Sequence, residues 1–509
     1  MDNSLLEKAK LYELEAEKKI SDIERPELHF SARTGWMNDP NGFSFCHGKY
    51  HLFYQYYPYD THWGPMHWGH AASSDLICWE YLPVALAPDM AYDCEGCFSG
   101  SAVELHDGRH LIMYTAVSRE NDKSDNNVQQ QCLAIGDGVR YEKYENNPVI
   151  KSTDVPEDFS IYDFRDPKLI KVADGSYLSL IGSMKADRDG QVLLYTSKDG
   201  FSWSFKSILA TNGHRFGTMW ECPDFFELDG KWVLLISPTE MQASDMEYPN
   251  GHGTLCLMGE YDAITGKFTE ESDQAVDYGI DFYAMQTVKA PDGRQIMIGW
   301  LQNWDTLNIR PDGCKWFGQM SIPRELSVVN GRLCQSPIRE LLNYRQNEVR
   351  HEGVISDEEL SIRGIEGRVI DMTINVSSVE NNLSFFDVKL ACDGHFYTEL
   401  KYDFAESILK LSRMHSGIGI AGLHESCCKV DRDGESIDFR IILDRYSVEV
   451  FACGGRYVLS MAIWTEPTAG GISFAAKGKA NIDVVKYDIV SHGVDCDFDD
   501  EYGNIQCEE

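Results

Sequence analysis

Residues 36–42 read Trp36-Met37-Asn38-Asp39-Pro40-Asn41-Gly42, and the arrangement that begins here recurs along the chain. Pro40 fixes its own φ and biases Asp39 towards an extended backbone, while Asn41-Gly42 supplies a turn. The Asp39 carboxylate is therefore expected at a rigid strand end. Gly48, nine residues after Asp39, lies in a tight turn that leads into the apolar run Tyr50 to Tyr57. This pattern predicts a β-hairpin.

Hairpins of the same design, an apolar strand, a glycine turn and a second apolar strand, recur four more times. Their turns are Asp107-Gly108, Asp174-Gly175, Asp229-Gly230 and Asp292-Gly293, and from Gly48 onward successive turn glycines are 60, 67, 55 and 63 residues apart. A second repeat places an aromatic residue four positions after Asp75, Asp137 and Asp199, which lie 62 residues apart. Two hairpins therefore fit in each period. Five periods of four strands predict a five-bladed β-propeller.

Equivalent positions in the blades of a propeller face one another across its axis. Counting back nine residues from each turn glycine gives Asp39, Ser99, Asp166, Glu221 and Ala284. A single acidic residue beside a turn is better interpreted as a solvated loop residue. Three of them at the same phase of a repeat favour a shared site, so we expect Asp39, Asp166 and Glu221 to meet in one cleft.

The composition narrows the class of protein. A chain of 509 residues, 43% hydrophobic and 12% aromatic, is long enough for two or more folded domains. A formal charge of -35 argues against nucleic acid and anionic membranes as partners, and whether the chain forms a homo-oligomer stays open. Met1 to Arg25 is charged and helix-prone, unlike a secretory signal. An odd number of cysteines, 15, scattered singly, suits reduced thiols, so we expect a cytoplasmic protein.

The chain divides into five segments. Residues 1–25 predict a helical extension, 26–335 the propeller, and 336–349 a short linker helix. From 350 to 494, alternating apolar and polar segments predict an antiparallel β-sandwich, and 495–509 form an acidic tail. The predicted fold is thus all-β, a five-bladed β-propeller followed by a C-terminal β-sandwich, with a short N-terminal helix.

Two groups of residues have the spacing of metal ligands. Cys94 and Cys97 form a C-x-x-C pair, but no second pair accompanies them, so a turn with two thiols is the better interpretation. His62, His67 and His70 alternate with Trp-Gly pairs, which indicates an aromatic loop at the mouth of the channel. No metal site is predicted.

Paired carboxylates in an aromatic cleft suit glycoside hydrolysis, because an oxocarbenium-like transition state needs a negative neighbour and the leaving oxygen needs a proton. WMNDPNG at 36–42, FSGS at 98–101, RDP at 165–167 and ECPD at 221–224 resemble the motifs of glycoside hydrolase family 32, the invertases and fructan hydrolases. The runs HLFYQYYPYD, HWGPMHWGH and LPVALAP are similar to its intracellular bacterial branch, which contains β-fructofuranosidases and sucrose-6-phosphate hydrolases. The resemblance extends to DRYSVEVF at 444–451 and covers nearly the whole chain.

The resemblance implies a role for each carboxylate. Asp39 is expected to be the nucleophile, Glu221 the general acid and then base, and Asp166 the residue that stabilises the transition state by bonding fructose hydroxyls. It also implies a set of sugar-binding residues, with no metal or organic cofactor. That set is Asn38, Gln55, Trp63, Phe98, Ser99, Arg165 and Trp300.

Two other functions stay open: an inverting furanosidase of a related propeller family, and a sugar-binding propeller without turnover. The candidate substrates are sucrose, sucrose-6-phosphate and short fructo-oligosaccharides. A phosphate site needs converging Lys or Arg side chains, and none stand out near the motifs. We therefore expect unphosphorylated substrates, cut from the fructose end, with at most a modest preference for the phosphorylated sugar.

Overall fold

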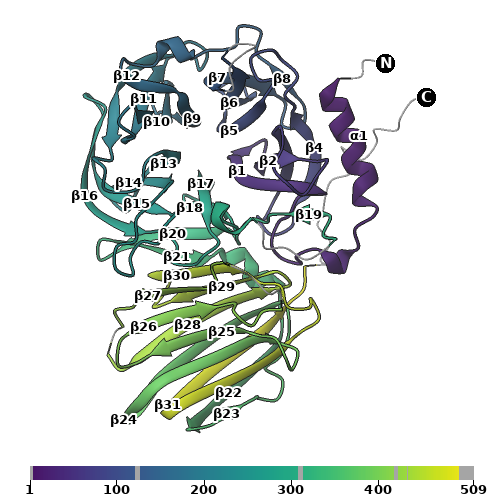
Figure 1. Cartoon of the computed structure of the whole chain (residues 1–509), viewed down its shortest axis with the longest axis vertical. Coiled ribbons are helices and arrows are strands. Elements are labelled where there is room, and N and C mark those ends of the chain that lie inside the picture. The colour runs from purple at the N-terminus through teal and green to yellow at the C-terminus, as the bar shows by residue number, and fades with distance from the viewer. Residues whose placement is uncertain (1–3, 121–125, 308–312, 418–421, 433, 492–509) are drawn as a thin grey trace.

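Five β-sheets stand radially around an axis, and a β-sandwich packs below them (Figure 1). The computed structural model describes residues 4–120, 126–307, 313–417, 422–432 and 434–491. This arrangement confirms the predicted all-β fold. The N-terminal helix α1 (Leu5–Glu17) begins at Ser4, whose hydroxyl accepts a hydrogen bond from Glu7 N, and it packs against the outer strand of the first blade.

The first three blades each contain four consecutive antiparallel strands. Blade 1 contains β1 (Gly35–Cys46), β2 (Lys49–Tyr57), β3 (His67–Ser73) and β4 (Glu80–Leu86). Blade 2 contains β5 (Gly96–Glu104), β6 (His110–Arg119), β7 (Asn127–Gly136) and β8 (Tyr141–Lys143). Blade 3 contains β9 (Phe159–Lys171), β10 (Tyr177–Lys185), β11 (Gly190–Ser197) and β12 (Ser204–Thr211), and a 3-10 helix, η2 (Ser152–Asp154), precedes it.

The last two blades complete the ring. Blade 4 contains β13 (Trp220–Leu228), β14 (Lys231–Pro238), β15 (Leu255–Asp262) and β16 (Lys267–Ala275). Blade 5 contains β17 (Tyr283–Lys289), β18 (Gln295–Trp300), β20 (Arg324–Val329) and β21 (Arg332–Pro337). Between β18 and β20, strand β19 (Trp316–Phe317) pairs in parallel with β1. The ring is thus closed by joining blade 1 to the connection inside blade 5.

The Asp repeat marks the turns between the third and fourth strands. In each turn one carboxylate oxygen of Asp75, Asp137 or Asp199 accepts hydrogen bonds from the backbone N–H groups two and three residues later. Asp262 does the same in blade 4. The repeat therefore reflects a turn geometry that the side chain of an Asp stabilises.

The C-terminal sandwich is built around two long strands that pair with each other, β24 (Ile370–Cys392) and β31 (Gly471–Ile489). The shorter strands are β22 (Arg345–Ser356), β23 (Glu359–Leu360), β25 (Thr398–Asp403), β26 (Ile408–Ser412), β27 (Glu425–Lys429), β28 (Ser436–Asp444), β29 (Ser447–Ala452) and β30 (Tyr457–Ala462). The predicted acidic tail, 495–509, lies outside the described residues.

The predicted linker helix over 336–349 is wrong in extent. A 3-10 helix, η4, spans only Arg339–Tyr344, and β22 starts at the next residue. Residues 345–349 have a composition that suits a helix, but β22 pairs with β31, more than a hundred residues later in the chain. Long-range strand pairing here overrides local preference.

Buried charges join the sandwich to the propeller. The Arg324 guanidinium of β20 contacts Asp277 at 2.9 Å and donates through Nε and Nη2 to Oε2 of Glu449 in β29. Oε1 of Glu449 accepts a hydrogen bond from Ile322 N at 2.7 Å. His29, in the segment before β1, lies between Asp444 and Glu449, 2.9 Å from each. All five side chains are fully buried or nearly so. The residues before β1 are therefore fixed by the sandwich.

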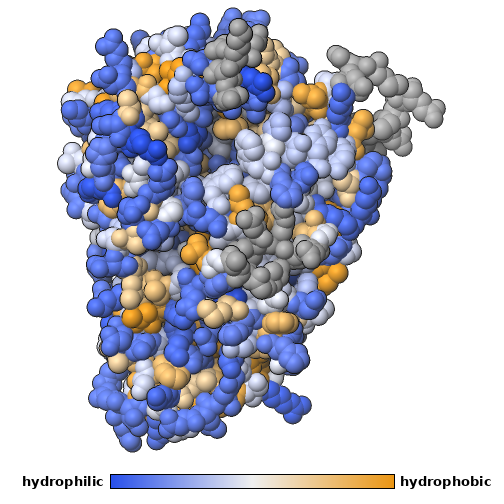
Figure 2. Space-filling view, viewed as in Figure 1, coloured by the Kyte–Doolittle hydropathy of each residue, from blue (hydrophilic) through white to orange (hydrophobic). Residues whose placement is uncertain are grey.

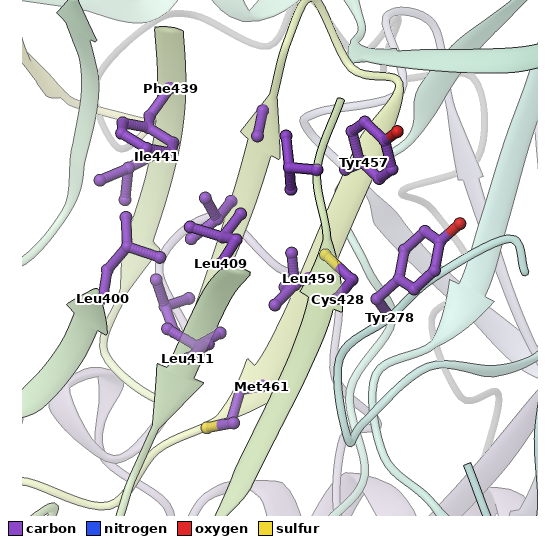
Figure 3. Close-up of a cluster of buried hydrophobic side chains, with 14 of the residues drawn as sticks. Tyr278, Leu400, Leu409, Leu411, Cys428, Phe439, Ile441, Tyr457, Leu459 and Met461 are labelled. Atoms are coloured by element: carbon purple, nitrogen blue, oxygen red, sulfur yellow. The ribbon is translucent and has the colours of Figure 1, made fainter. Parts of the chain in front are cut away.

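Apolar packing continues across the same boundary. Figure 3 shows leucines of β25 and β26 near Phe439 and Ile441, with Tyr278 and Tyr457 at the other side of the cluster, next to Cys428 and Leu459. The rings of Tyr278, from the propeller, and Tyr457, from the sandwich, lie 5.8 Å apart.

The face of the molecule drawn in Figure 2 is mostly hydrophilic, with small scattered apolar groups. Among the described residues, no helix has the length and apolar character needed to cross a membrane.

Candidate active site

The candidate site is built on irregularities in the strands nearest the axis. The first strands of the blades (β1, β5, β9, β13 and β17) contact one another around the ring. Each has a β-bulge at a similar level, where its pairing with the second strand shifts by one residue. A bulge leaves a residue unpaired and changes the direction of its side chain.

The bulges show that counting back nine residues from each turn glycine does not select equivalent positions in the blades. Asp166 and Cys222 are the first bulge residues of β9 and β13, and both have left-handed φ angles, 64° and 49°. Glu221 is the last paired residue before its bulge, as Arg165 is in β9. Glu221 is therefore equivalent to Arg165, not to Asp166. The count was wrong because two lengths differ and cancel only in part. The β13–β14 turn is two residues long and the β9–β10 connection is five, whereas β13 has one more residue than β9 between the start of its bulge and its last paired residue.

The three predicted carboxylates nevertheless line one cavity of about 300 Å³. Asp39 comes from β1, Asp166 from β9 and Glu221 from β13. The other described residues that line it are Asn38, Gln55, Trp63, Phe98, Ser99, Gln129, Tyr162, Asp163, Arg165 and Trp304.

Asp39 is buried and held by hydrogen-bond donors. The Ser99 hydroxyl donates to Oδ2 at 2.6 Å, and the Asn38 amide donates to Oδ1 at 3.0 Å. Trp36 Nε1 donates to the amide oxygen of Asn38 at 2.7 Å, which fixes the orientation of that amide. Burial raises the pKa of Asp39, while the two donors oppose the rise. The donors thus favour an ionised carboxylate in a buried position.

Glu221 is held from two sides. Arg165 donates to Oε1 through Nε at 3.0 Å and Nη2 at 2.8 Å. The Tyr283 hydroxyl lies 2.7 Å from Oε2, within donating distance. Arg165 also contacts Asp163 at 3.2 Å. The orientation of the Glu221 carboxylate is therefore fixed by side chains of the two neighbouring inner strands, β9 and β17.

Asp166 and Cys222 connect the three carboxylates. Cys222 N donates to Asp166 Oδ2 at 3.0 Å, and its thiol lies 3.6 Å from an oxygen of both Asp39 and Asp166. Burial, followed by the Glu221 carboxylate, raises the pKa of Asp166 to about 7. Burial also raises the pKa of the Cys222 thiol well above its ordinary value, so this group is a donor rather than a thiolate.

Six of the seven predicted sugar-binding residues line the cavity, and Trp300 does not. Trp300 is fully buried, with its ring 6.0 Å from Trp36 and 5.2 Å from Trp304. It is the last residue of β18, and the 3-10 helix η3 (Trp304–Thr306) instead brings Trp304 to the cavity. Trp300 is therefore a packing residue behind the wall.

Four lining residues were not predicted: Gln129, Tyr162, Asp163 and Trp304. Asp163 precedes Arg165 by two positions in β9, so strand alternation could have placed both on one face. Gln129, in the third strand of blade 2, has no comparable signal in the sequence.

The two groups of residues that have the spacing of metal ligands differ in how deeply their members are buried. His62 is exposed, whereas His67 and His70 are buried, and burial lowers the pKa of His67 to about 4. Cys94 is exposed and Cys97 is buried. Within the described part of the chain, no three His, Cys, Asp or Glu side chains are arranged to hold a metal ion.

Comparisons with known proteins agree with this geometry. Residues 29–337 match the model of the glycosyl hydrolases family 32 N-terminal domain, and residues 340–491 match that of the family 32 C-terminal domain. A sucrose-6-phosphate hydrolase of Zymomonas mobilis is 36% identical over 483 residues, which cover 91% of each chain. A raffinose invertase of Escherichia coli is 36% identical over 470 residues, covering 89% of this chain and 93% of that protein.

Solved structures give the same result. A family 32 β-fructofuranosidase of Bombyx mori, in complex with sucrose, aligns with a TM-score of 0.83 and 33% identity, covering 96% of this chain and 99% of that one. A sucrose-6-phosphate hydrolase of Lactobacillus gasseri aligns with a TM-score of 0.81 and 27% identity, covering 94% and 96%. Both halves of the chain, its motifs and its fold therefore place it in glycosyl hydrolase family 32.

Proposed function

We propose that Asp39, Glu221 and Asp166 perform the chemistry of this retaining β-fructofuranosidase, with sucrose and short fructo-oligosaccharides as its substrates. The observation that carries the proposal is the convergence of these carboxylates, from three different blades, on one cavity. Retaining glycosidases need one carboxylate as nucleophile and a second carboxyl group as proton donor.

In the first step, an oxygen of Asp39 bonds to the anomeric carbon of the terminal fructosyl unit. The bond from that carbon to the leaving oxygen breaks, and Glu221 gives its proton to that oxygen. In the second step, Glu221 takes a proton from water, the water oxygen bonds to the anomeric carbon, and Asp39 is released as a carboxylate. The donors around Asp39 and the fixed orientation of Glu221 support these separate roles.

Asp166 is proposed to accept hydrogen bonds from the fructose hydroxyls. It lies beside both other carboxylates through Cys222, and its position in the bulge of β9 supports contact with the same sugar. Hydrogen bonds that strengthen as the ring flattens lower the barrier more than they tighten substrate binding.

The role assignment is tested with two variants and two leaving groups. Asp39→Ala should lose activity on every fructoside. Glu221→Ala should be nearly inactive on sucrose, partly active on a fructoside whose leaving group needs no protonation, and further accelerated by azide in the second step. The assignment is wrong if the two variants respond alike to the activated leaving group.

Retention itself is read from the first product anomer by NMR. Release of the β-anomer of fructose before mutarotation supports the covalent mechanism. Release of the opposite anomer would favour the inverting furanosidase, and no release of sugar would favour a binding module.

The preference for unphosphorylated substrates rests on charge. Among the described residues that line the cavity, Arg165 is the only cation, and it is already paired with Glu221 and Asp163. A net charge of -35 also repels a phosphate dianion. The test is the ratio of kcat/KM for sucrose-6-phosphate and sucrose at physiological salt. A preference for the phosphorylated sugar above roughly 100-fold, about 2.7 kcal/mol, would contradict this proposal.

A further inference from the structure

The motifs RDPK and ECPD each contain a charged residue that does not reach the active-site cavity. Lys168 follows Asp166 by two residues, and Asp224 follows Glu221 by three. Each is the first residue to pair with the second strand after the bulge of β9 or β13. Lys168 Nζ donates to Asp224 Oδ2 at 2.7 Å, so the pair links blades 3 and 4 on the same strands that carry Asp166 and Glu221.

Blade 5 completes this link. Thr287 N, in β17, donates to the same Asp224 oxygen at 2.6 Å, and Thr287 O accepts from Lys168 Nζ at 2.8 Å. The Lys168 and Asp224 side chains are only 11% and 1% exposed. The contacts of this small group therefore fix the offset of three inner strands relative to one another.

Hydrogen bonds in the same part of the strands also connect blade 2 with blades 3 and 5. Ser101 of β5 donates to Pro167 O at 2.7 Å and accepts from Leu169 N at 2.6 Å, so it holds β9 on both sides of Lys168. Gln286 of β17 donates to Gly100 O at 2.8 Å. We call Ser101, Lys168, Asp224, Gln286 and Thr287 the axial ring. It lies against a separate cavity of about 430 Å³ that shares no lining residue with the active site.

A buried ion pair is a poor source of stability. Removing two charges from water costs about as much as their attraction returns, and apolar residues of similar volume are often as stable. What the pair provides instead is a fixed distance and direction between two strands. Those strands carry Asp166 and Glu221, and the contact from Cys222 N to Asp166 depends on the same offset.

We propose that Lys168 and Asp224 are positioning residues for hydrolysis, because their ion pair sets the place of Asp166 relative to Glu221. This inference rests on the proposed roles of those two carboxylates. A displacement of about 1 Å between catalytic groups can cost roughly 100-fold in rate, so a modest strand shift is sufficient.

The test replaces the pair with apolar residues, Lys168→Met with Asp224→Leu. We expect thermal stability close to the wild type, kcat for sucrose reduced roughly 10- to 100-fold, and KM changed by less than about threefold. Because β13 carries the proton donor, the activated fructoside should lose less rate than sucrose. The ratio of the two rates is a readout that a purely structural role leaves unchanged.

Blade 2 offers a matched control. Lys143 and Asp93 form another Lys–Asp pair, 2.6 Å apart with side chains 12% and 0% exposed, and neither lines the active-site cavity. Lys143→Met with Asp93→Leu should alter stability without changing kcat or the leaving-group ratio.

The proposal is overturned if the Lys168 and Asp224 double variant folds, keeps kcat within about twofold of the wild type and leaves the ratio unchanged. If that variant fails to fold, Asp224→Asn, which preserves volume, provides the same comparison. Retained activity in Asp39→Ala would contradict the proposed function itself, so the failure of that proposal can be distinguished from the failure of this one.

Discussion

Ser99 controls the charge of the nucleophile through one short hydrogen bond. Its hydroxyl donates to Asp39 Oδ2 at 2.6 Å, with both residues buried. In Ser99→Ala that oxygen keeps only the more distant Cys222 thiol, 3.6 Å away, among its described side-chain contacts. Burial already raises the pKa of Asp39, and Ser99 opposes the rise, so the substitution should raise that pKa further.

A hydrogen bond to a charged group contributes about 1.5 to 3 kcal/mol. Only the carboxylate form of Asp39 can attack, so on the acidic side of the pH profile this loss appears fully in kcat/KM. We expect a reduction of roughly 10- to 100-fold there. At alkaline pH the nucleophile is ionised in both proteins, and the difference should be only a few-fold.

The assay is kcat/KM for sucrose from pH 4 to 9, compared between Ser99→Ala and the wild type. Ser101→Ala is the control, because it removes a buried hydroxyl of the same strand that bonds the backbone of β9 rather than a carboxylate, so any loss from a strand shift should be equal at every pH. An equal loss at every pH in Ser99→Ala would refute the reasoning, since it would show that Ser99 does not act through ionisation of Asp39.

Three further outcomes are expected. Burial alone would lower the pKa of His29, but Asp444 and Glu449 outweigh burial and raise that pKa to about 9. The free energy that protonated His29 contributes to the folded state is therefore fully present below pH 6.5, and it is lost as the pH rises through about 9. In calorimetry between pH 7 and 10, the wild type should lose on the order of 3 kcal/mol that His29→Gln lacks throughout. Trp63→Ala removes an exposed cavity ring and should raise KM for sucrose roughly 3- to 10-fold with little change in kcat. Trp300→Phe should lower the unfolding temperature and leave KM unchanged, and a KM increase as large as that of Trp63→Ala would restore Trp300 to the substrate site.

The sequence predicts the fold because the repeat is periodic at two levels. Glycine turns mark the first hairpin of each blade, and Asp turns mark the second in blades 1 to 4, so the number of blades follows from the repeat. The repeat also brings Asp39, Asp166 and Glu221 to the same region of their inner strands, although not to equivalent positions. The register in which the strands pair is harder to predict from the sequence. Glu221 and Cys222 differ by one position, and only the strand pairing reveals which of them occupies the bulge.

Residues placed by loops or distant strands are the ones that the sequence does not specify. Trp300 and Trp304 have the same chemistry four residues apart, and the turn after β18 decides which of them reaches the cavity. Residues 345–349 become a strand only because β31 is available to pair with them. The cytoplasmic location stays a prediction, and whether the chain forms a homo-oligomer stays open.

Because His29 binds two residues of the sandwich, its final contacts can form only late in the synthesis of the chain. The 415 residues that separate His29 from Asp444 take roughly 20 to 80 s to translate at about 5 to 20 residues per second. During that time His29 lacks its partners Asp444 and Glu449, and β1 also waits for β19 to emerge. The first blade to leave the ribosome is therefore among the last parts of the enzyme to be locked in place.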